Sequence, residues 1–594
     1  MRSRHHRRWF SPFALVLLLV LIIPILAACG GPGAATPTTG TTGGTTPEAQ
    51  ATQPPAATEP AATEPAATEP PTTGDTSKFL VFGGSGEPDS LDSMNTTAGT
   101  ALIVTRQIEE PLIGFEPGTT NLQPLLATEW SANEDSTEWT FKLREGVTFH
   151  DGTPFNADAV VFNFKRGLEP DFEFGFRGGD SPKTYPIFPD IFGGYKGDPN
   201  TLYENVEAVD EYTVKFTFKQ PVPLFPNYVA ASYFGISSPE AIKQAGANYG
   251  TPDGGAVGTG PFKFLEWRPG ENVTLVRNEE YWGEKARMPG VVFRFISDPA
   301  QRYAELQSGA VDFTINLAPD TRQQIEQSGN LKVVDLEPFN IAYLSFDLTV
   351  EPLNDLRVRQ AIAHAIDRQA ILEGLYGGVG EVAHDFLPDG LAWARPDDLT
   401  TYDYNPERAR ELLAEAGYPD GFSTMTLTDG TELPLELWYM PVSRPYYPTP
   451  QPVAEAYASY LAEVGINVEL KTEDWGVYLD NWDAGRKHGL VMLGWTGDYA
   501  DPNNFLFTHF GPGNADEAGY VNQQVWDLLK QAAAAPSQEE SAELFKEAGR
   551  MINQDLPRLP IVHSPPVYAA KQALEGWVPN PTGGEPFASI FIEK

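Results

Sequence analysis

The sequence predicts a mixed α/β protein, and three observations support this prediction. Strand-like apolar patterns occur at 138–149 and 213–221, and LVMLGW (490–495) has the composition of a buried strand. Segments with the 3.6-residue apolar period of helices lie between and after them. No low-complexity stretch interrupts the chain after Lys78, so we expect about 500 residues to form one assembly of roughly three intertwined domains.

The N-terminus has the pattern of a targeting segment. A basic stretch, MRSRHHRR, precedes the apolar run FALVLLLVLIIPILAA, which Pro24 interrupts and which is marginal as a membrane span. The run ends in LAAC, which resembles a bacterial lipoprotein box whose cysteine is diacylated and becomes the first mature residue. We therefore predict a signal peptide at 1–28 and a lipidated Cys29. Alternatives are an ordinary signal peptide or anchor with a chance cysteine, and Arg7-Arg8 also resembles a twin-arginine signal.

Residues 29–77 are predicted to form a disordered tether. After Cys29 the chain consists mainly of Thr, Pro, Ala and Gly, and PAATE occurs three times between Pro55 and Glu69. Such a segment has almost nothing apolar to bury and can span several nanometres. Cys29 is the only cysteine, which rules out an intramolecular disulfide, and lipidation explains the lone thiol best. The lipid would hold the protein on the outer face of a membrane without spanning it.

The charge of the chain argues against two kinds of partner. The formal net charge is −39, from 41 basic and 80 acidic residues. A chain this acidic is unsuited to bind nucleic acid or to grip anionic lipid through its charge. Aromatic residues make up 12% of the chain, which suits a protein that holds ligands with rings, although a large core has the same effect.

Helical periodicity predicts most of the helices. In the segment 354–375, Ala361, Ile362, Ala365 and Ile366 form one apolar stripe. In 406–417, Pro406 occupies the first helical position and Gly417 the C-cap. The other predicted helices are 156–168, 299–310, 452–464, 523–535 and 537–553.

No motif indicates catalysis, and we expect neither an enzyme nor a cofactor or metal site. The chain has no GxSxG, HExxH, Walker or CxxC motif, and its eight histidines show no pair at helical ligand spacing. The oxygen-bearing run Asp498, Asp501, Asn503 and Asn504 lacks the Gly and terminal Glu of an EF-hand loop. Taken alone, Asp498 reads as a turn-capping acid and Arg444 as a surface arginine.

Several stretches together resemble one known family. They are ATEWSANEDSTEWTFKLREGVTFHDGTPFNADAVVFNFKR, GTGPF at 258–262, and NDLRVRQAIAHAIDRQAI. Their order and spacing resemble the peptide-binding group (family 5) of solute-binding proteins that serve ABC importers, from about residue 78 to the C-terminus. Within that group, ELWYMPVSRPYYPTP (436–450) and LGWTGDYADPNNF (493–505) are most similar to dipeptide-binding members.

The resemblance implies a two-lobed, periplasmic-binding-protein-like fold with an extra inserted domain. The first lobe would comprise 78–125, 257–340 and 565–594, the inserted domain 126–256, and the second lobe 341–564. Hinge strands would lie near Glu337–Tyr343 and His563–Tyr568. The segment 172–200 is an insertion that is either a surface hairpin or a cover for the cleft, and 508–520 lacks the cysteines of Gram-negative dipeptide-binding proteins.

The resemblance also implies a ligand site. A dipeptide has an ammonium and a carboxylate about 5–7 Å apart, and a closed cleft must supply each with an opposite charge. Asp498 would receive the ammonium, and Arg444 the carboxylate through its planar fork. We expect Trp495, Tyr446 and Met440 as apolar walls, and Gly494 and Gly497 as points where backbone approaches the ligand. From the first lobe, the loop 83–100 would supply Gly86, Glu87 and Thr100.

The implied function is that of a monomeric, lipid-anchored receptor outside the cytoplasm. It would capture dipeptides or short peptides by closing its lobes and deliver them to an ABC permease whose ATPase is a separate chain. Other ligands remain open at this point, namely longer oligopeptides, haem, nickel chelates and oligosaccharides. Two other classes of protein also remain open: a secreted hydrolase, and an adhesion or scaffold protein.

Overall fold

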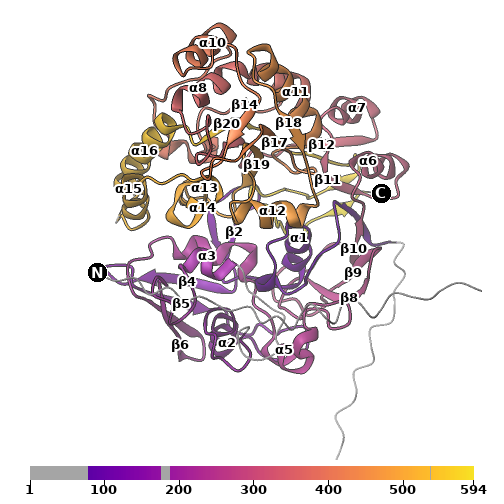
Figure 1. The fold of residues 1–594 in the computed structure, drawn as a ribbon. Helices are drawn as coiled ribbons and strands as arrows, with labels where there is room; N and C mark the ends of the chain where they lie inside the picture. Colours follow the sequence, from indigo (N-terminus) through magenta and orange to yellow (C-terminus); the bar gives the residue numbers. More distant parts are fainter. Residues whose placement is uncertain (1–77, 176–186, 536, 594) are drawn as a thin grey trace, which may run out of the picture. The chain divides into compact units, whose positions relative to one another are not determined.

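The fold is described from a computed structural model, which describes residues 78–175, 187–535 and 537–593. The predicted signal peptide, the lipidated Cys29 and the tether lie outside the described residues and stay predictions. Within those ranges, no helix is long and apolar enough to cross a membrane. The mixed α/β class is confirmed, because three larger sheets alternate with helices along the chain (Figure 1).

A seven-stranded sheet is built from three distant stretches of the chain. In spatial order its strands are β12 (Leu331–Val334), β21 (Val567–Lys571), β11 (Phe313–Leu317), β1 (Leu80–Gly84), β10 (Gly290–Phe295), β9 (Asn272–Arg277) and β8 (Phe262–Arg268). Near it lie α1 (Gly99–Ile108), α6 (Pro299–Ser308) and α7 (Thr321–Ser328). We call this part lobe I. The expected helix at 299–310 is α6, which Asp298 caps and which ends at Gly309 with φ 79°.

A four-stranded antiparallel sheet forms the part that we call domain II. Its order is β4 (Ala127–Ala132), β5 (Glu138–Leu143), β7 (Thr213–Phe218) and β6 (Tyr203–Asp210). The helix α2 (Ala157–Leu168) packs on β6 and β7 and is capped by the Asn156 side chain. Leu112, Ile113 and Phe115 also pack in this core, although the sequence places them in the first lobe. The domain boundaries themselves stay predictions.

The insertion 172–200 is anchored in the protein at both described ends. Phe172 and Phe174 contact the ring of Phe162 on α2, with ring centroids 5.4 and 5.3 Å away. On the other side, α3 (Ile187–Phe192) places Phe188 in the core of domain II. A Cβ at Gly167 would lie 2.5 Å from the Phe188 ring, so the glycine makes room for this contact. These flanks are therefore parts of a core, and residues 176–186 lie outside the described ranges.

A six-stranded sheet forms the part that we call lobe II. Its order is β14 (Glu381–Val382), β20 (Arg558–His563), β13 (Asn340–Phe346), β19 (Leu490–Thr496), β17 (Glu436–Trp438) and β18 (Glu469–Lys471). Every residue of β13 is buried. The single helix expected at 354–375 is two helices, α8 (Leu356–Ala365) and α9 (Arg368–Leu375). Ile366 is extended, and the Asp367 side chain caps α9 by accepting from Ala370 N.

The remaining elements complete the three parts. The helices expected at 406–417, 452–464, 523–535 and 537–553 are α10 (Pro406–Glu415), α11 (Pro450–Glu463), α15 (Gln523–Ala533) and α16 (Gln538–Asp555). Further helices are α4 (Phe225–Ala230), α5 (Pro239–Ala245), α12 (Trp475–Asp483), α13 (Asn503–Phe510) and α14 (Ala515–Ala518), with 3-10 turns η2 (Ser93–Asn95), η3 (Ser232–Phe234), η4 (Gly246–Asn248), η5 (Asp389–Ala394) and η6 (Pro512–Asn514). Short strand pairs are β2 (Ile113–Phe115) with β3 (Leu122–Pro124), β15 (Thr424–Thr426) with β16 (Glu432–Pro434), and β22 (Leu574–Glu575) with β23 (Phe591–Ile592).

The chain crosses between lobe I and lobe II at the two segments expected as hinges. One crossing joins β12 to β13, and the other joins β20 to β21. Asn340 ties the two together, because its Nδ2 donates to Ser564 O at 2.9 Å and its carbonyl lies 2.6 Å from His563 Nδ1. The two crossing segments are therefore held side by side, the arrangement that a two-stranded hinge requires.

Candidate functional site

Asp498 lies just beyond the end of a strand in the middle of lobe II. The strand β19 pairs antiparallel with β13 and parallel with β17, so it is fixed on both edges. It ends at Thr496, and Gly497 N donates to Phe339 O at 2.9 Å. Asp498 follows, half-buried, at the point where the chain leaves the sheet. A rigid strand thus sets the position of this carboxylate.

The amide of Asn504 holds Asp498 and Trp495 in place. Its Oδ1 accepts from Asp498 N at 2.8 Å and from Trp495 Nε1 at 3.1 Å. Its Nδ2 donates to Asp498 Oδ2 at 3.3 Å. Asn504 is 3% exposed, so these bonds are shielded from water. One amide therefore fixes both the backbone and the carboxylate of Asp498.

A side chain of domain II also bonds to the Asp498 carboxylate. The Tyr233 hydroxyl on η3 donates to Asp498 Oδ1 at 2.7 Å. The next residue of lobe II, Tyr499, is packed in the apolar core of domain II, where its ring meets Tyr228 edge-on at 5.0 Å. The loop that carries Asp498 thus connects lobe II to domain II.

The oxygen-bearing side chains compared above with an EF-hand loop bond mainly to protein donors. Asp501 is 3% exposed and accepts from Asn503 N at 2.7 Å. Burial raises the pKa of Asp501 to about 7. The Asn504 amide is occupied by Asp498 and Trp495. The described residues contain no cluster of three or more His, Cys, Asp or Glu side chains suited to a metal.

Arg444 has no paired acid in the part of the chain that the structure describes. Its backbone forms a bridge with Tyr447, at 3.0 and 3.1 Å, so its loop is a tight turn. Its guanidinium stacks on Trp475 of α12, with Cζ 4.7 Å from the ring centroid. Among the described residues, no carboxylate lies within 4.0 Å of it, and its buried Nε has no hydrogen-bond partner. The fork of Arg444 is therefore available to an anion.

The loop of Arg444 packs against the strand that leads to Asp498. A Cβ at Gly494 would lie 2.2 Å from the Tyr446 ring, so the missing side chain lets Tyr446 rest on β19. At Gly497 the space is filled by Phe339, 2.3 Å from a hypothetical Cβ. These glycines admit rings of the protein itself, which differs from the ligand approach that we expected. Met440 also departs from expectation. It is fully buried in the core of lobe II and does not line a wall of the site.

The expected residues of lobe I lie together, but their contacts stay within that lobe. Thr100 Oγ1 donates to Glu87 O at 3.3 Å, and a Cβ at Gly86 would lie 3.5 Å from Thr100. The Glu87 carboxylate accepts from Trp267 Nε1 at 2.8 Å and from Gly270 N at 3.1 Å. Both donors belong to the β8–β9 hairpin and its turn, so the structure does not bring this carboxylate to Asp498.

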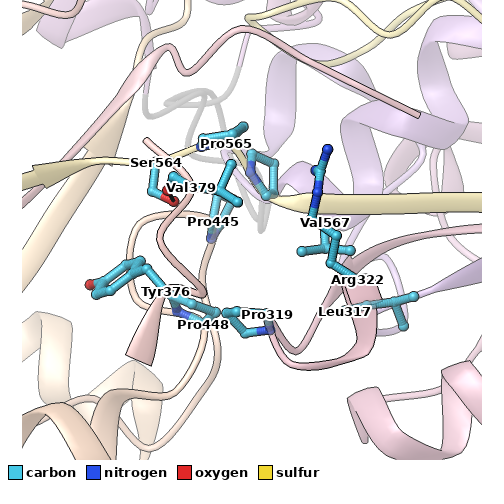
Figure 2. A pocket seen from close by; sticks show the side chains of 11 residues that line it. Leu317, Pro319, Arg322, Tyr376, Val379, Pro445, Pro448, Ser564, Pro565 and Val567 are labelled. Carbon is cyan, nitrogen blue, oxygen red and sulfur yellow. Dashed lines mark hydrogen bonds between the residues drawn. The ribbon is translucent and has the colours of Figure 1, made fainter. Parts of the chain in front are cut away.

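A narrow crevice lies on the hinge side of the Arg444 loop (Figure 2). Tyr376 contributes to its wall and also donates from its hydroxyl to Tyr446 O at 2.9 Å. The crevice has room for about one water molecule, so it is too small for a dipeptide. Its lining comes from both lobes and the crossing segment: Leu317, Pro319, Arg322, Tyr376, Val379, Pro445, Pro448, Ser564, Pro565, Pro566 and Val567.

Sequence reasoning missed Tyr233 and the positioning role of Asn504. Asn504 stood in the quoted motif, but its pattern suggested only an oxygen ligand. Tyr233 lies in a stretch, AASYFGISS, without any motif, and it is 265 residues away from Asp498. Only the packing of domain II against lobe II makes the contact visible.

Comparison with known proteins shows which family this chain resembles. Residues 121–517 match the family model described as bacterial extracellular solute-binding proteins, family 5 middle. A dipeptide-binding protein of Escherichia coli K12 is 32% identical over 531 residues, covering 87% of this chain and 95% of the relative. Haem-binding protein A of Haemophilus influenzae is 31% identical, covering 82% of this chain and 87% of that protein.

Solved structures give the same match. A dipeptide-binding protein from Pseudoalteromonas sp. SM9913, in complex with Met-Leu, superposes with a TM-score of 0.76 at 26% identity, covering 87% of this chain and 100% of that one. The periplasmic binding protein DppA of Helicobacter pylori, in complex with peptide STSA, gives a TM-score of 0.74 at 28% identity, covering 87% and 98%.

Proposed function

Because the chain belongs to family 5 of the bacterial extracellular solute-binding proteins, we propose that it captures dipeptides or short peptides and hands them to an ABC permease. The peptide is held by its two ends, with its ammonium on Asp498 and its terminal carboxylate on Arg444. The relatives named for dipeptides support the ligand class. The protein binds and releases its cargo without changing it.

The observation that supports the peptide ligand most is the unpaired guanidinium of Arg444. In a chain with a net charge of −39, this cation has no acid within 4.0 Å among the described residues. Trp475 stacks on one of its faces and a tight turn fixes its backbone. A stacked, oriented guanidinium with free donors suits a carboxylate, because the two groups form parallel hydrogen bonds.

Asp498 supplies the opposite charge on a neighbouring element. Its strand touches the Arg444 loop through Gly494 and Tyr446, so both charges project from one region of lobe II. A cleft that closes removes water from both ends of the peptide, and each buried charge then needs its partner. Lobe closure is favoured by contacts that exist only in the closed state.

We further propose that the mature protein is anchored through a lipid on Cys29 and tethered by residues 30–77. Replacing Cys29 with Ser should leave a folded, peptide-binding protein that is released into the medium. A Cys29→Ser protein that stays tightly membrane-bound after signal processing would contradict the anchor without affecting the peptide proposal.

The peptide proposal is tested by native mass spectrometry and calorimetry on the purified protein. We expect a co-purified or added dipeptide to bind one to one, to remain intact after incubation, and to compact the protein in small-angle scattering. Haem is the second ligand to titrate, because one relative is named for it. Haem binding that excludes dipeptides, or cleavage of the added peptide, would overturn the proposal.

A further inference from the structure

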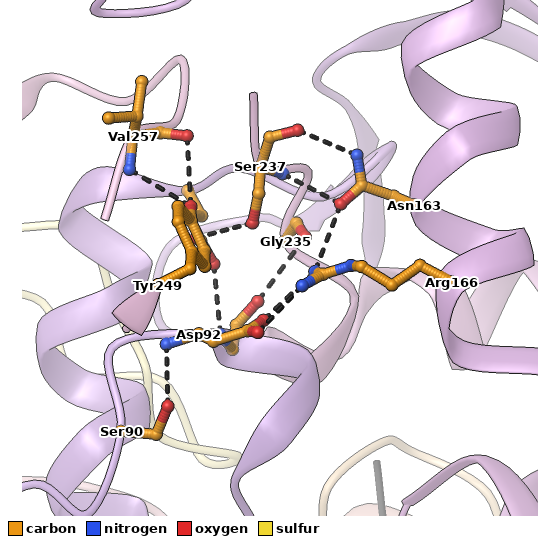
Figure 3. Close-up of polar contacts among 10 residues, drawn as sticks. Ser90, Asp92, Asn163, Arg166, Gly235, Ser237, Tyr249 and Val257 are labelled. Atoms are coloured by element: carbon orange, nitrogen blue, oxygen red, sulfur yellow. Dashed lines mark hydrogen bonds and ion pairs between the residues drawn. The ribbon is translucent and has the colours of Figure 1, made fainter. Parts of the chain in front are cut away.

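Tyr233 stands on a rigid element of domain II. The turn η3 is followed by Gly235 and Ser237, which join a buried polar network (Figure 3). Gly235 O accepts from Ser93 Oγ at 3.4 Å, and Ser237 Oγ donates to Glu109 Oε1 at 2.7 Å. The Asn163 amide on α2 donates to Ser237 O at 2.8 Å. These contacts fix the backbone that carries Tyr233.

An ion pair without solvent exposure completes the network. Arg166 donates to both carboxylate oxygens of Asp92, at 2.8 and 3.0 Å, and both side chains are 0% exposed. A bidentate pair in such surroundings has little freedom to move. The Tyr233 hydroxyl is therefore presented at a set position by domain II, and not by a loose loop.

The Tyr233 hydroxyl bonds to a carboxylate of lobe II. Asp498 Oδ1 accepts from Tyr233 at 2.7 Å, while Asp498 Oδ2 accepts from Asn504 within lobe II. A carboxylate has about four acceptor sites, so one Asp498 side chain can bond to several partners at once. Tyr499 buries its ring in domain II beside this contact.

We propose that Tyr233 is the cross-lobe partner of the ammonium receptor, a positioning residue that couples lobe closure to peptide capture. This inference rests on the proposed function of Asp498. In the open state Asp498 would keep the bonds that Asn504 makes to it within lobe II. Closure adds the Tyr233 hydrogen bond to the same carboxylate, which fixes the orientation of the carboxylate toward the ammonium. The contact stabilises the closed state directly, whatever side chains the peptide has.

A double-mutant cycle measures this coupling. Tyr233→Phe should weaken binding of the dipeptide Met-Leu about tenfold or more, as expected for the loss of a hydrogen bond to a charged group. In an Asp498→Ala background, the same change should have almost no further effect. An unchanged affinity for Tyr233→Phe, or the same loss in both backgrounds, would overturn the inference.

Tyr203→Phe is the matched control. Its hydroxyl also donates to a carboxylate, Glu169 Oε1, at 2.9 Å, but both residues belong to domain II. We expect Tyr203→Phe to leave Met-Leu affinity unchanged within about twofold. If it lowers the affinity as much as Tyr233→Phe does, the effect is general to domain II and the cross-lobe assignment is wrong.

A second measurement keeps the inference separate from the peptide proposal. Hydrogen exchange on the empty protein needs no ligand, because the empty protein samples the closed state in which the Tyr233 bond forms. Tyr233→Phe should shorten those visits and speed exchange at 498–504 in lobe II, while Tyr203→Phe should not. Faster exchange at 498–504 supports the contact even if no dipeptide binds to the wild type, which would refute only the proposed function. Equal exchange in wild type and Tyr233→Phe would overturn the inference.

Discussion

Domain II takes part in two sets of hydrogen bonds that are built around carboxylates. In the network of Figure 3, Asp92 and Glu109 are buried and their partners come from lobe I and domain II. Around Asp498, the carboxylate is half-buried and its partners come from lobe II and domain II. The first group contains the cation Arg166, bound to Asp92, whereas the Asp498 carboxylate accepts from the Tyr233 hydroxyl and the Asn504 amide.

The difference separates a structural acid from a receptor. A buried acid paired with arginine is part of the folded structure, and removing the arginine leaves a buried charge without compensation. A half-buried acid that hydroxyl and amide donors orient is held in position where solvent and solutes can still reach it. We therefore expect changes in the first group to appear in stability and changes in the second to appear in binding.

Arg166→Ala should give the largest effect, on stability. It leaves Asp92 buried without its cation, and removing one partner of a buried pair costs about 3–5 kcal/mol. Chemical denaturation should show this loss, while the fraction that remains folded should bind Met-Leu normally. Replacing both charges, in Asp92→Asn with Arg166→Met, should recover part of the stability. A single variant as stable as wild type would contradict a structural role for the pair.

Asp498→Ala should give a comparable effect on binding instead. A dipeptide ammonium would be buried without its counter-charge, at a cost of about 3–5 kcal/mol, or roughly 10²–10⁴ in affinity. Calorimetry with Met-Leu measures this loss, and Arg444→Ala should show a similar one through the carboxylate. The melting temperature of the empty protein should stay close to that of wild type.

The control for the Asp498→Ala experiment is a ligand without an ammonium group. N-acetyl dipeptides lack the ammonium, so they should bind wild type weakly and be nearly indifferent to Asp498→Ala. A turn-capping acid would weaken both ligands alike and lower the melting temperature. Equal affinity of wild type for free and acetylated dipeptides would refute the ammonium assignment.

Part of the pH dependence of stability should arise from the buried Glu109 carboxyl. Burial, and then the nearby Asp92 charge, raise the pKa of Glu109 to about 7, above its ordinary value of 4.5. The protonated form is favoured in the folded state, so its contribution is complete below about pH 4.5 and is lost as pH rises through about 7. Urea unfolding at pH 5 and pH 8 should differ by up to about 3 kcal/mol from this group.

Glu109→Gln should remove that part of the pH dependence, because the amide does not titrate. The exposed Glu129→Gln is the matched control and should leave the profile unchanged. In the site loop, burial also raises the pKa of Asp501 to about 7, so Asp501→Asn should flatten a second, separate part. A profile that Glu109→Gln does not alter would show that this carboxyl titrates alike in the folded and unfolded chains.

The sequence predicted the helices well where their signals are local. Pro406 and the cap Asn405 set the start of α10, and the apolar stripe of α8 was visible in its spacing. The break between α8 and α9 was missed, because the stripe continues through Ile366 while the Asp367 side chain caps a new helix. A capping bond of one side chain outweighed the periodic pattern.

For the site, motifs indicated the charges but not their surroundings. Asp498 and Arg444 stood in stretches similar to the family, whereas Met440 stood in the same stretch and proved to be core. The alternation of apolar and polar residues does not show which side chains of a loop are buried. Tyr233 has no local signal at all, since its partner is 265 residues distant. Such contacts follow from the packing of domains and not from any sequence pattern.

The smallest predicted effect concerns the amide that positions Asp498. Asn504→Ala removes the acceptor for Asp498 N and Trp495 Nε1, and a buried donor without a partner costs about 1–3 kcal/mol. We expect denaturation to show a stability loss of about this size, and calorimetry to show about tenfold weaker binding of Met-Leu with little change for N-acetyl dipeptides. Asn503→Ala is the matched control, because the Asn503 Oδ1 has no hydrogen-bond partner among the described residues and its backbone bond to Asp501 remains. It should change stability by less than about 0.5 kcal/mol. If Asn504→Ala weakens free and acetylated dipeptides equally, Asn504 supports the fold of the loop without orienting the carboxylate.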